Sequence, residues 1–246
     1  MGFAMKYVKY LLIFILALSF PLFIVTGNIR FFASEIRIYQ YSVDTYAIEK
    51  ITGISSAELK RIYQHWIDYY NAKELSSQVI VEKMNGDKIE LLSEKEIIHL
   101  EDVKGLIRLD YAVQMVCLLL LLLCAGLIFF LTRNWLMVLK PIFTGSIAAI
   151  IIMLGLGVIA LISFDRLFLF FHEISFANQF WILDPRTDYL IMMFPSGFFY
   201  DIVIFCFSAV AIQFALISGI VFIVQRRLKG AEMANLPDVP NILHST

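Results

Sequence analysis

The chain has 246 residues, of which 60% are hydrophobic and 15% aromatic, and its mean hydropathy is +0.78. Globular domains average about 45–50% apolar residues, so this composition excludes an ordinary globular protein and indicates an integral membrane protein. The formal net charge of −1 gives no sign of a nucleic-acid partner.

Four apolar stretches are long enough to cross a bilayer as helices, which takes about 20 residues. They cover approximately Val8–Ile29, Tyr111–Leu131, Pro141–Ser163 and Ile202–Val224. The first contains the small-residue pattern Ala17-Leu18-Ser19 of a signal-peptide cleavage site, but its apolar run continues to Val25. This length favours a retained signal anchor. We therefore expect an α-helical integral membrane protein with four transmembrane helices.

The basic residues that flank the spans all fall on one side of a four-span arrangement. They are Lys6, Lys9, Arg133, Lys140, Arg226, Arg227 and Lys229. Because cytoplasmic loops carry the excess of lysine and arginine, both termini are expected to be cytoplasmic. The two long connectors then face outward.

This topology predicts six segments along the chain. They are an N-terminal signal-anchor helix (1–31), an extracytoplasmic cap that runs into the second span (32–110), spans two and three (111–163), an outer interfacial loop (164–201), span four (202–229) and a cytoplasmic tail (230–246). The three cysteines, Cys117, Cys124 and Cys206, lie in spans, so we expect neither a disulfide framework nor a thiolate site. His244, in the tail, is assigned no role.

The cap is predicted to be a small α+β unit. Ser55 and Glu58 form a capping box that opens a helix, and Asn85-Gly86 lies between two alternating stretches, as in a β-hairpin. The helix places one apolar face inward, made of Leu59, Ile62, Tyr63, Trp66 and Tyr70.

A second capping box, Ser93 with Glu96, opens a helix that we expect to merge with the second span. His99 lies on its apolar face, where a lone histidine is most often a core residue with one hydrogen bond. Asp102 follows at i+3, a spacing at which helical side chains meet.

The outer loop begins with His172, a few residues after the third span. Polar groups at membrane depth are costly and are usually functional when they face the protein interior, although an interfacial histidine can also simply anchor a helix end. The residues that accompany it are Glu173, Asn178, Trp181, Asp184, Arg186 and Asp188. This concentration of polar and aromatic groups favours a functional site.

Two histidines that each have a carboxylate nearby provide the groups needed for proton transfer at neutral pH. A metal site built from them is a weaker alternative, because the sequence has neither an HExxH helix nor a CxxC pair. No GxSxG elbow is present for serine catalysis. We expect no metal and no cofactor.

The helix EIIHLEDVKGLI and the loop FHEISFANQFWILDPRTDYLIMMFP, together with the four-span layout, resemble the lipoprotein intramolecular transacylases of Gram-positive bacteria. The resemblance covers almost the whole chain except the tail. It implies a multi-pass plasma-membrane enzyme with its active site at the outer leaflet.

The resemblance further implies the reaction. The substrate is a diacylglyceryl lipoprotein with a free N-terminal cysteine, and the sn-2 acyl chain moves to the α-amino group of that cysteine, giving a lyso-form lipoprotein. His99 and His172 match the catalytic histidines of the family. Five further residues are expected to support the histidines or to position the substrate: Asp102, Glu173, Asn178, Trp181 and Arg186. Membrane lipid is expected to surround the site. Two alternatives remain: a non-enzymatic membrane subunit whose cap binds a partner protein, and a metal-dependent hydrolase.

Overall fold

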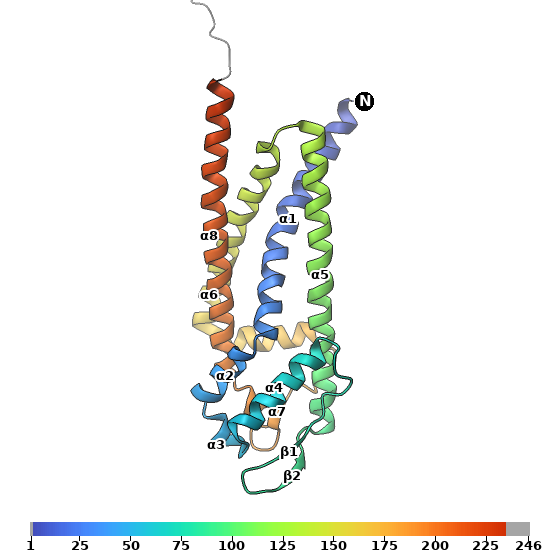
Figure 1. Ribbon diagram of the computed structural model, residues 1–246, viewed down its shortest axis with the longest axis vertical. Coiled ribbons are helices and arrows are strands. Elements are labelled where there is room, and N and C mark those ends of the chain that lie inside the picture. Colours follow the sequence, from blue (N-terminus) through green and yellow to red (C-terminus); the bar gives the residue numbers. More distant parts are fainter. Residues whose placement is uncertain (1, 235–246) are drawn as a thin grey trace, which may run out of the picture.

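Four long helices run side by side in a computed structural model that describes residues 2–234, with side chains for residues 5–231 (Figure 1). They are α1 (Gly2–Ser34), α5 (Glu94–Thr132), α6 (Leu136–Ser175) and α8 (Ser196–Ala234), and each contains a window apolar enough to cross a membrane. A small cap closes one end of the bundle. The expected fold class is confirmed, whereas most of the expected tail, including His244, lies outside the described residues.

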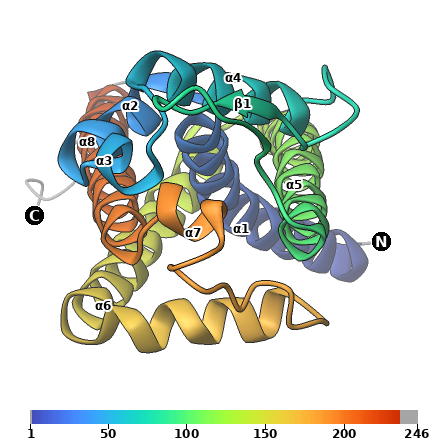
Figure 2. The ribbon, with the colours of Figure 1, turned by 90° about the horizontal axis from the view of Figure 1, so that it is seen from below.

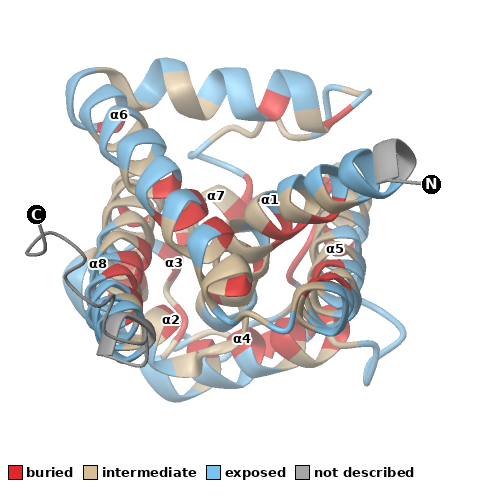
Figure 3. Cartoon of the chain, turned by 90° about the horizontal axis from the view of Figure 1, so that it is seen from above, coloured by how far each residue is buried: buried red, intermediate tan, exposed pale blue. Residues whose placement is uncertain are grey.

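Helix α1 is the centre of the bundle, because it packs against α5, α6 and α8. Its contact with α6 is close: a Cβ atom added to Gly145 would collide with the carbonyl oxygen of Ala17. Helices α5 and α6 touch each other less than each touches α1. Buried residues face this centre and exposed residues, mostly apolar, face outward, as a lipid-exposed bundle requires (Figure 3).

Helix α5 extends well beyond the bilayer. Its 39 residues span about 58 Å at 1.5 Å per residue, roughly twice the thickness of a hydrocarbon core. The charged first turns therefore stand outside the apolar part, as the sequence predicted. The predicted capping box is present at the helix start, where Glu96 Oε2 accepts a hydrogen bond from the backbone N–H of Ser93 at 2.7 Å.

Helix α6 changes direction where the sequence predicted that the third span would end. Ser163 has non-helical angles (φ −148°, ψ 51°), but the helix resumes and continues to Ser175. The continuation, 164–175, lies crosswise at the cap end of the bundle (Figures 1 and 2). At 1.5 Å per residue its 12 residues cover about 18 Å. The first part of the expected outer loop is thus a helix that carries His172 across the bundle.

The cap is built from α2 (Ile36–Thr45), α3 (Ile48–Thr52), α4 (Ser56–Tyr70), the hairpin β1 (Ile80–Glu82) and β2 (Lys88–Glu90), and α7 (Tyr189–Met193). The antiparallel hairpin pairs Val81 with Ile89, and the turn contains Gly86 at φ 89°. All five predicted core residues of α4 are buried. The helices α2, α3 and α7 were not predicted from the sequence.

The cap is not a separate domain. Its apolar core, which includes Leu190 and Met193 of α7, continues without a break into Leu100 of α5. The hydroxyl of Tyr63 in α4 also donates a hydrogen bond to the backbone oxygen of Met193 at 3.0 Å. The cap therefore holds the start of α5 and the 176–195 segment in a fixed relation to each other.

Candidate active site

His99 and His172 come together at the junction of the cap and the membrane helices. His99 lies in the early turns of α5 and His172 near the end of the crosswise part of α6. Their ring centroids are 6.2 Å apart, with an angle of 31° between the planes. Each residue is only 8% exposed. Burial of this kind disfavours a charged imidazole and favours the neutral form, which can accept a proton.

The tautomer of His172 is defined by its own helix. Its Nδ1 atom lies 2.7 Å from the backbone oxygen of Phe168, one turn earlier. A carbonyl oxygen only accepts hydrogen bonds, so Nδ1 carries the proton and Nε2 presents a lone pair. The aromatic rings of Phe168 and Trp181 flank the imidazole, with centroids at 4.2 and 5.1 Å.

The Nδ1 atom of His99 is buried and has no hydrogen-bond partner among the described residues. Most buried side-chain polar atoms are paired, and an unpaired one calls for a functional explanation. The ring of Phe176 packs edge-on against this imidazole at 4.9 Å and also lies 5.5 Å from His172. Phe176 therefore packs on both histidines.

Asp102 and Asn178 connect the two segments that carry the histidines. Asn178 Nδ2 donates a hydrogen bond of 2.8 Å to Asp102 Oδ2, and the backbone oxygen of Asn178 accepts the indole N–H of Trp181 at 3.0 Å. Asp102 thus bonds to the opposite segment rather than to His99. The single N–H of Trp181 is already used, so in this arrangement the indole positions His172 and does not offer a hydrogen bond to a substrate.

Among the described residues, neither Glu173 nor Arg186 forms a hydrogen bond or ion pair with His99 or His172. Glu173 is exposed, and the Nδ1 partner of His172 is the Phe168 carbonyl rather than this carboxylate. Arg186 is exposed and forms a fork with Asp184, 2.7 Å from Nη2 to Oδ2, which lowers the pKa of the Asp184 carboxyl. The structure brings the other five predicted site residues together: His99, Asp102, His172, Asn178 and Trp181.

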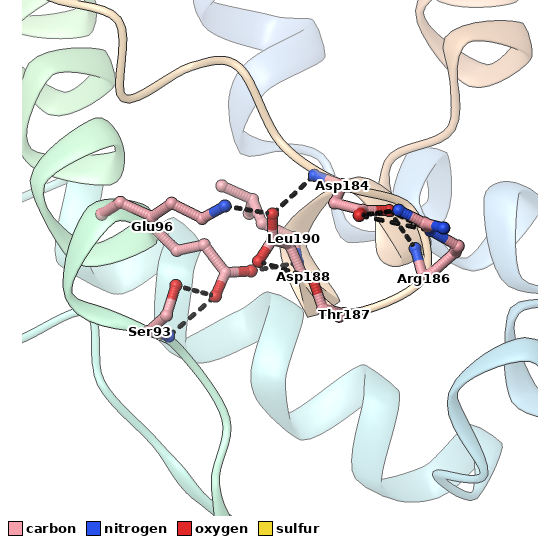
Figure 4. A network of polar contacts seen from close by, with 8 residues as sticks. Ser93, Glu96, Asp184, Arg186, Thr187, Asp188 and Leu190 are labelled. Carbon is pink, nitrogen blue, oxygen red and sulfur yellow. Dashed lines mark hydrogen bonds and ion pairs between the residues drawn. The ribbon is translucent and has the colours of Figure 1, made fainter.

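A buried polar network attaches the 184–190 segment to the start of α5 (Figure 4). Glu96, which is 1% exposed, accepts the backbone N–H of Leu190 at 2.8 Å through the oxygen that the capping box leaves free. Lys95 Nζ lies 2.6 Å from Asp188 Oδ2, and this same oxygen accepts the backbone N–H of Asp184 at 2.6 Å. Each end of the segment is therefore anchored to the helix that carries His99.

Sequence reasoning overlooked three of these groups: Phe176, the Phe168 carbonyl and the second role of Glu96. Phe168 and Phe176 lie at i−4 and i+4 from His172, so they would have been found had α6 been extended through this region. The second role of Glu96 depends on a contact 94 residues away, for which the sequence carries no signal.

No group of three or more His, Cys, Asp or Glu side chains that could hold a metal ion occurs in the part of the chain that the structure describes. The three cysteines are free thiols within α5 and α8, two of them buried. The chemistry available at the site is therefore that of two imidazoles, a bridged carboxylate and aromatic walls.

Comparison with family models identifies the chain. The model of the lipoprotein intramolecular transacylase Lit matches residues 14–199. The chain belongs to this family. It is accordingly a membrane-integral acyltransferase that acts on lipoproteins, and the alternative of a non-enzymatic membrane subunit is set aside.

Solved structures of family members have the same fold. The structure of Lit from Bacillus cereus matches with a TM-score of 0.72 at 21% identity, over 90% of this chain and 99% of that one. Two variants of the same protein, with one histidine changed to arginine or to alanine, match with TM-scores of 0.68 and 0.69 at 20% identity. They cover 92% of this chain and 96% and 98% of theirs. None of the curated proteins compared with the chain matches it.

Proposed function

We propose that this transacylase moves the sn-2 acyl chain of a diacylglyceryl lipoprotein to the α-amino group of its N-terminal cysteine by histidine acid–base catalysis. The observation that carries the proposal is the 6.2 Å separation of the His99 and His172 rings, buried where the cap meets the membrane helices. The acyl chains of a lipoprotein anchor it in the membrane, so its ester lies at this boundary. We place the boundary at the outer leaflet and both termini in the cytoplasm, because the flanking basic residues lie at the opposite end of the bundle.

The substrate supplies both reacting groups, so the enzyme needs no nucleophile of its own. The amine nitrogen attacks the ester carbonyl, the N–C bond forms, and the C–O bond to the glyceryl oxygen breaks. The proton lost by the amine is gained by that oxygen, and no water is consumed. Holding the two groups in contact can remove up to about 7–11 kcal/mol from the barrier of a well-oriented intramolecular reaction.

The two histidines take different roles in this proposal. His172 acts as the base through Nε2, because its Nδ1–H is committed to the Phe168 carbonyl. His99 donates a hydrogen bond from its neutral imidazole to the carbonyl oxygen, since its Nδ1 is unpaired among the described residues. His172 then passes the proton that it accepted from the amine to the leaving glyceryl oxygen, so both imidazoles return to their starting state. Asp102, Asn178 and Trp181 act through the histidines as positioning residues. Glu173 and Arg186, both exposed, contribute at most to contacts with the peptide or headgroup.

The proposal is tested in a bacterium that lacks N-acylated lipoproteins, by mass spectrometry of the N-terminal lipopeptide. The wild-type chain should move one acyl chain to nitrogen while the total acyl content stays constant. His99→Ala and His172→Ala should each reduce the transfer by about 10²-fold or more, the lower range of general acid–base contributions. His65→Ala is the matched control, because His65 is a half-buried cap residue whose ring bonds to the Ser76 backbone oxygen and makes no described contact with either site histidine.

The remaining alternative makes a different prediction. A metal-dependent hydrolase would release a free fatty acid and lose activity with a strong chelator. Transfer that continues in the chelator, with no loss of acyl groups, would exclude it. Full transfer by either alanine variant would remove that histidine from the mechanism.

A further inference from the structure

We infer that Phe176 determines which acyl groups the enzyme transfers, by forming the wall against which the first carbons of the chain must lie. The inference rests on the proposed histidine mechanism and assigns specificity within the same site.

Phe176 is placed so that a group held by both imidazoles also meets its ring. The ring lies 4.9 Å from that of His99, at 72°, and 5.5 Å from that of His172. The acyl carbonyl must reach His99 while the attacking amine reaches His172. The carbon atoms next to the carbonyl are then in van der Waals reach of the phenyl ring.

The backbone that carries the ring is anchored, and burial leaves the ring little room to move aside. Phe176 is 8% exposed and follows the last turn of α6, where its backbone N–H donates to the His172 carbonyl oxygen at 3.0 Å. Its backbone is extended (φ −121°, ψ 128°), which turns the chain toward Asn178 and the hydrogen bond to Asp102. Both sides of the residue are thus anchored. An anchored aromatic ring beside a reacting centre excludes substrates by volume.

The ring of Phe176 also contacts a residue on the outer surface of the crosswise part of α6. Phe171, which is 48% exposed, lies 6.4 Å from Phe176 with its ring at 87°, and 5.4 Å from His172. The neighbouring Phe170 is 57% exposed and has no described ring contact with either histidine. An acyl chain held beside Phe176 can therefore continue along Phe171 toward lipid, while Phe170 only borders the outside.

The test uses the full-length enzyme in vesicles with two synthetic diacylglyceryl lipopeptides that have a free N-terminal cysteine. One has a straight sn-2 chain and the other a methyl branch at the third carbon of that chain, and they are supplied in equal amounts. The ratio of the two N-acyl products is measured by mass spectrometry. The wild type should favour the straight chain, and Phe176→Ala should raise the relative use of the branched chain by about tenfold or more, the range for one carbon in an apolar pocket.

Phe170→Ala is the control and should leave the product ratio unchanged. Phe176→Leu gives the same comparison with less change in volume if the alanine variant does not fold. A product ratio equal to that of the wild type, in either folded Phe176 variant, overturns the inference. Absence of any N-acyl product from the wild-type enzyme would instead overturn the proposed function, so the two failures are distinguishable.

Discussion

The hydrogen bond from Asn178 Nδ2 to Asp102 Oδ2 joins the segment after His172 to the helical turn after His99. A charge-assisted hydrogen bond of this kind is stronger than a neutral one and defines a direction as well as a distance. If the two buried rings catalyse the transfer as proposed, a displacement of about 1 Å can reduce the rate by about 10²-fold. We therefore expect the bond to position the rings rather than to contact the substrate.

The amide and the carboxylate of this bond can be exchanged as a test. Asn178→Asp places two carboxylates face to face, so we expect the transfer rate to fall by about 10- to 100-fold. Combining it with Asp102→Asn restores an amide opposite a carboxylate and should recover most of the rate. The measurement is N-acyl product per unit of membrane protein, with the thermal midpoint recorded for each variant. If the transfer rate falls equally in the single and the double variant while the thermal midpoint of unfolding stays unchanged, the positioning role is contradicted.

The identity of the site residues was predictable to different degrees. The segments that carry His99 and His172 were visible in the sequence, because a polar group beside a long apolar run is conspicuous. The residues that contact these two histidines were not visible in the same way. Glu173 was an obvious neighbour of His172 along the chain, but a helix that continues to Ser175 directs the Nδ1 atom to its own backbone at Phe168 instead.

At the scale of the helices, the close contact of α1 with α6 depends on a glycine, which has no side chain to hold the two backbones apart. Without a hydrophobic effect between helices in lipid, close backbone approach through small residues contributes much of the packing energy. Gly145 provides such an approach to Ala17. The rest of α6 has glycines without any such neighbour.

Gly145→Ala should accordingly destabilise the protein, because the new Cβ atom meets rigid backbone and the two helices must separate. The expected cost is about 1–3 kcal/mol, typical of overpacking, seen as a lower thermal midpoint in detergent. Gly155→Ala lies in the same helix with nothing within 4 Å of its Cβ position and should not lower the midpoint. Similar midpoints for both variants would show that the bundle adjusts freely at this contact.

The helices themselves were predictable because hydropathy determines membrane spans, but how far they continue beyond the apolar runs was only partly predictable. The end of the apolar run at Ser163 was visible, but the residues next to it contain no proline or glycine, so the sequence did not show that the helix resumes in a new direction there. The helix α2 was missed because short amphipathic helices give a weak periodic signal. The capping box at Ser93 was found because its side-chain chemistry is local.

At the scale of the whole molecule, the cap lies at the opposite end of the bundle from the start of α1 and the end of α8 (Figure 1). The transfer proposed for this enzyme requires the cap to be outside the cell, since lipoproteins are anchored in the outer leaflet. The basic residues at the other end agree with this orientation.

Cysteine labelling of intact cells measures the orientation directly. Leu75→Cys, at a cap residue that is 98% exposed, should react with a membrane-impermeant maleimide. Lys140→Cys, at an exposed residue near the start of α6, should react only after the membrane is permeabilised. The opposite pattern would invert the topology and with it the assignment of the reaction to the outer leaflet.

Because α6 changes direction at Ser163, the depth of His172 in the membrane does not depend directly on the tilt of the spanning part of the helix. A membrane helix tilts when the bilayer becomes thinner, and a histidine at the tip of a straight helix would sink or rise with it. His172 is instead carried on the crosswise part of α6 (Figure 2), and the segment after it is bonded to α5 through Asn178 and Asp102. If His172 is the base proposed above, we expect this arrangement to keep its distance from the ester constant when lipid composition, and therefore membrane thickness, changes during growth.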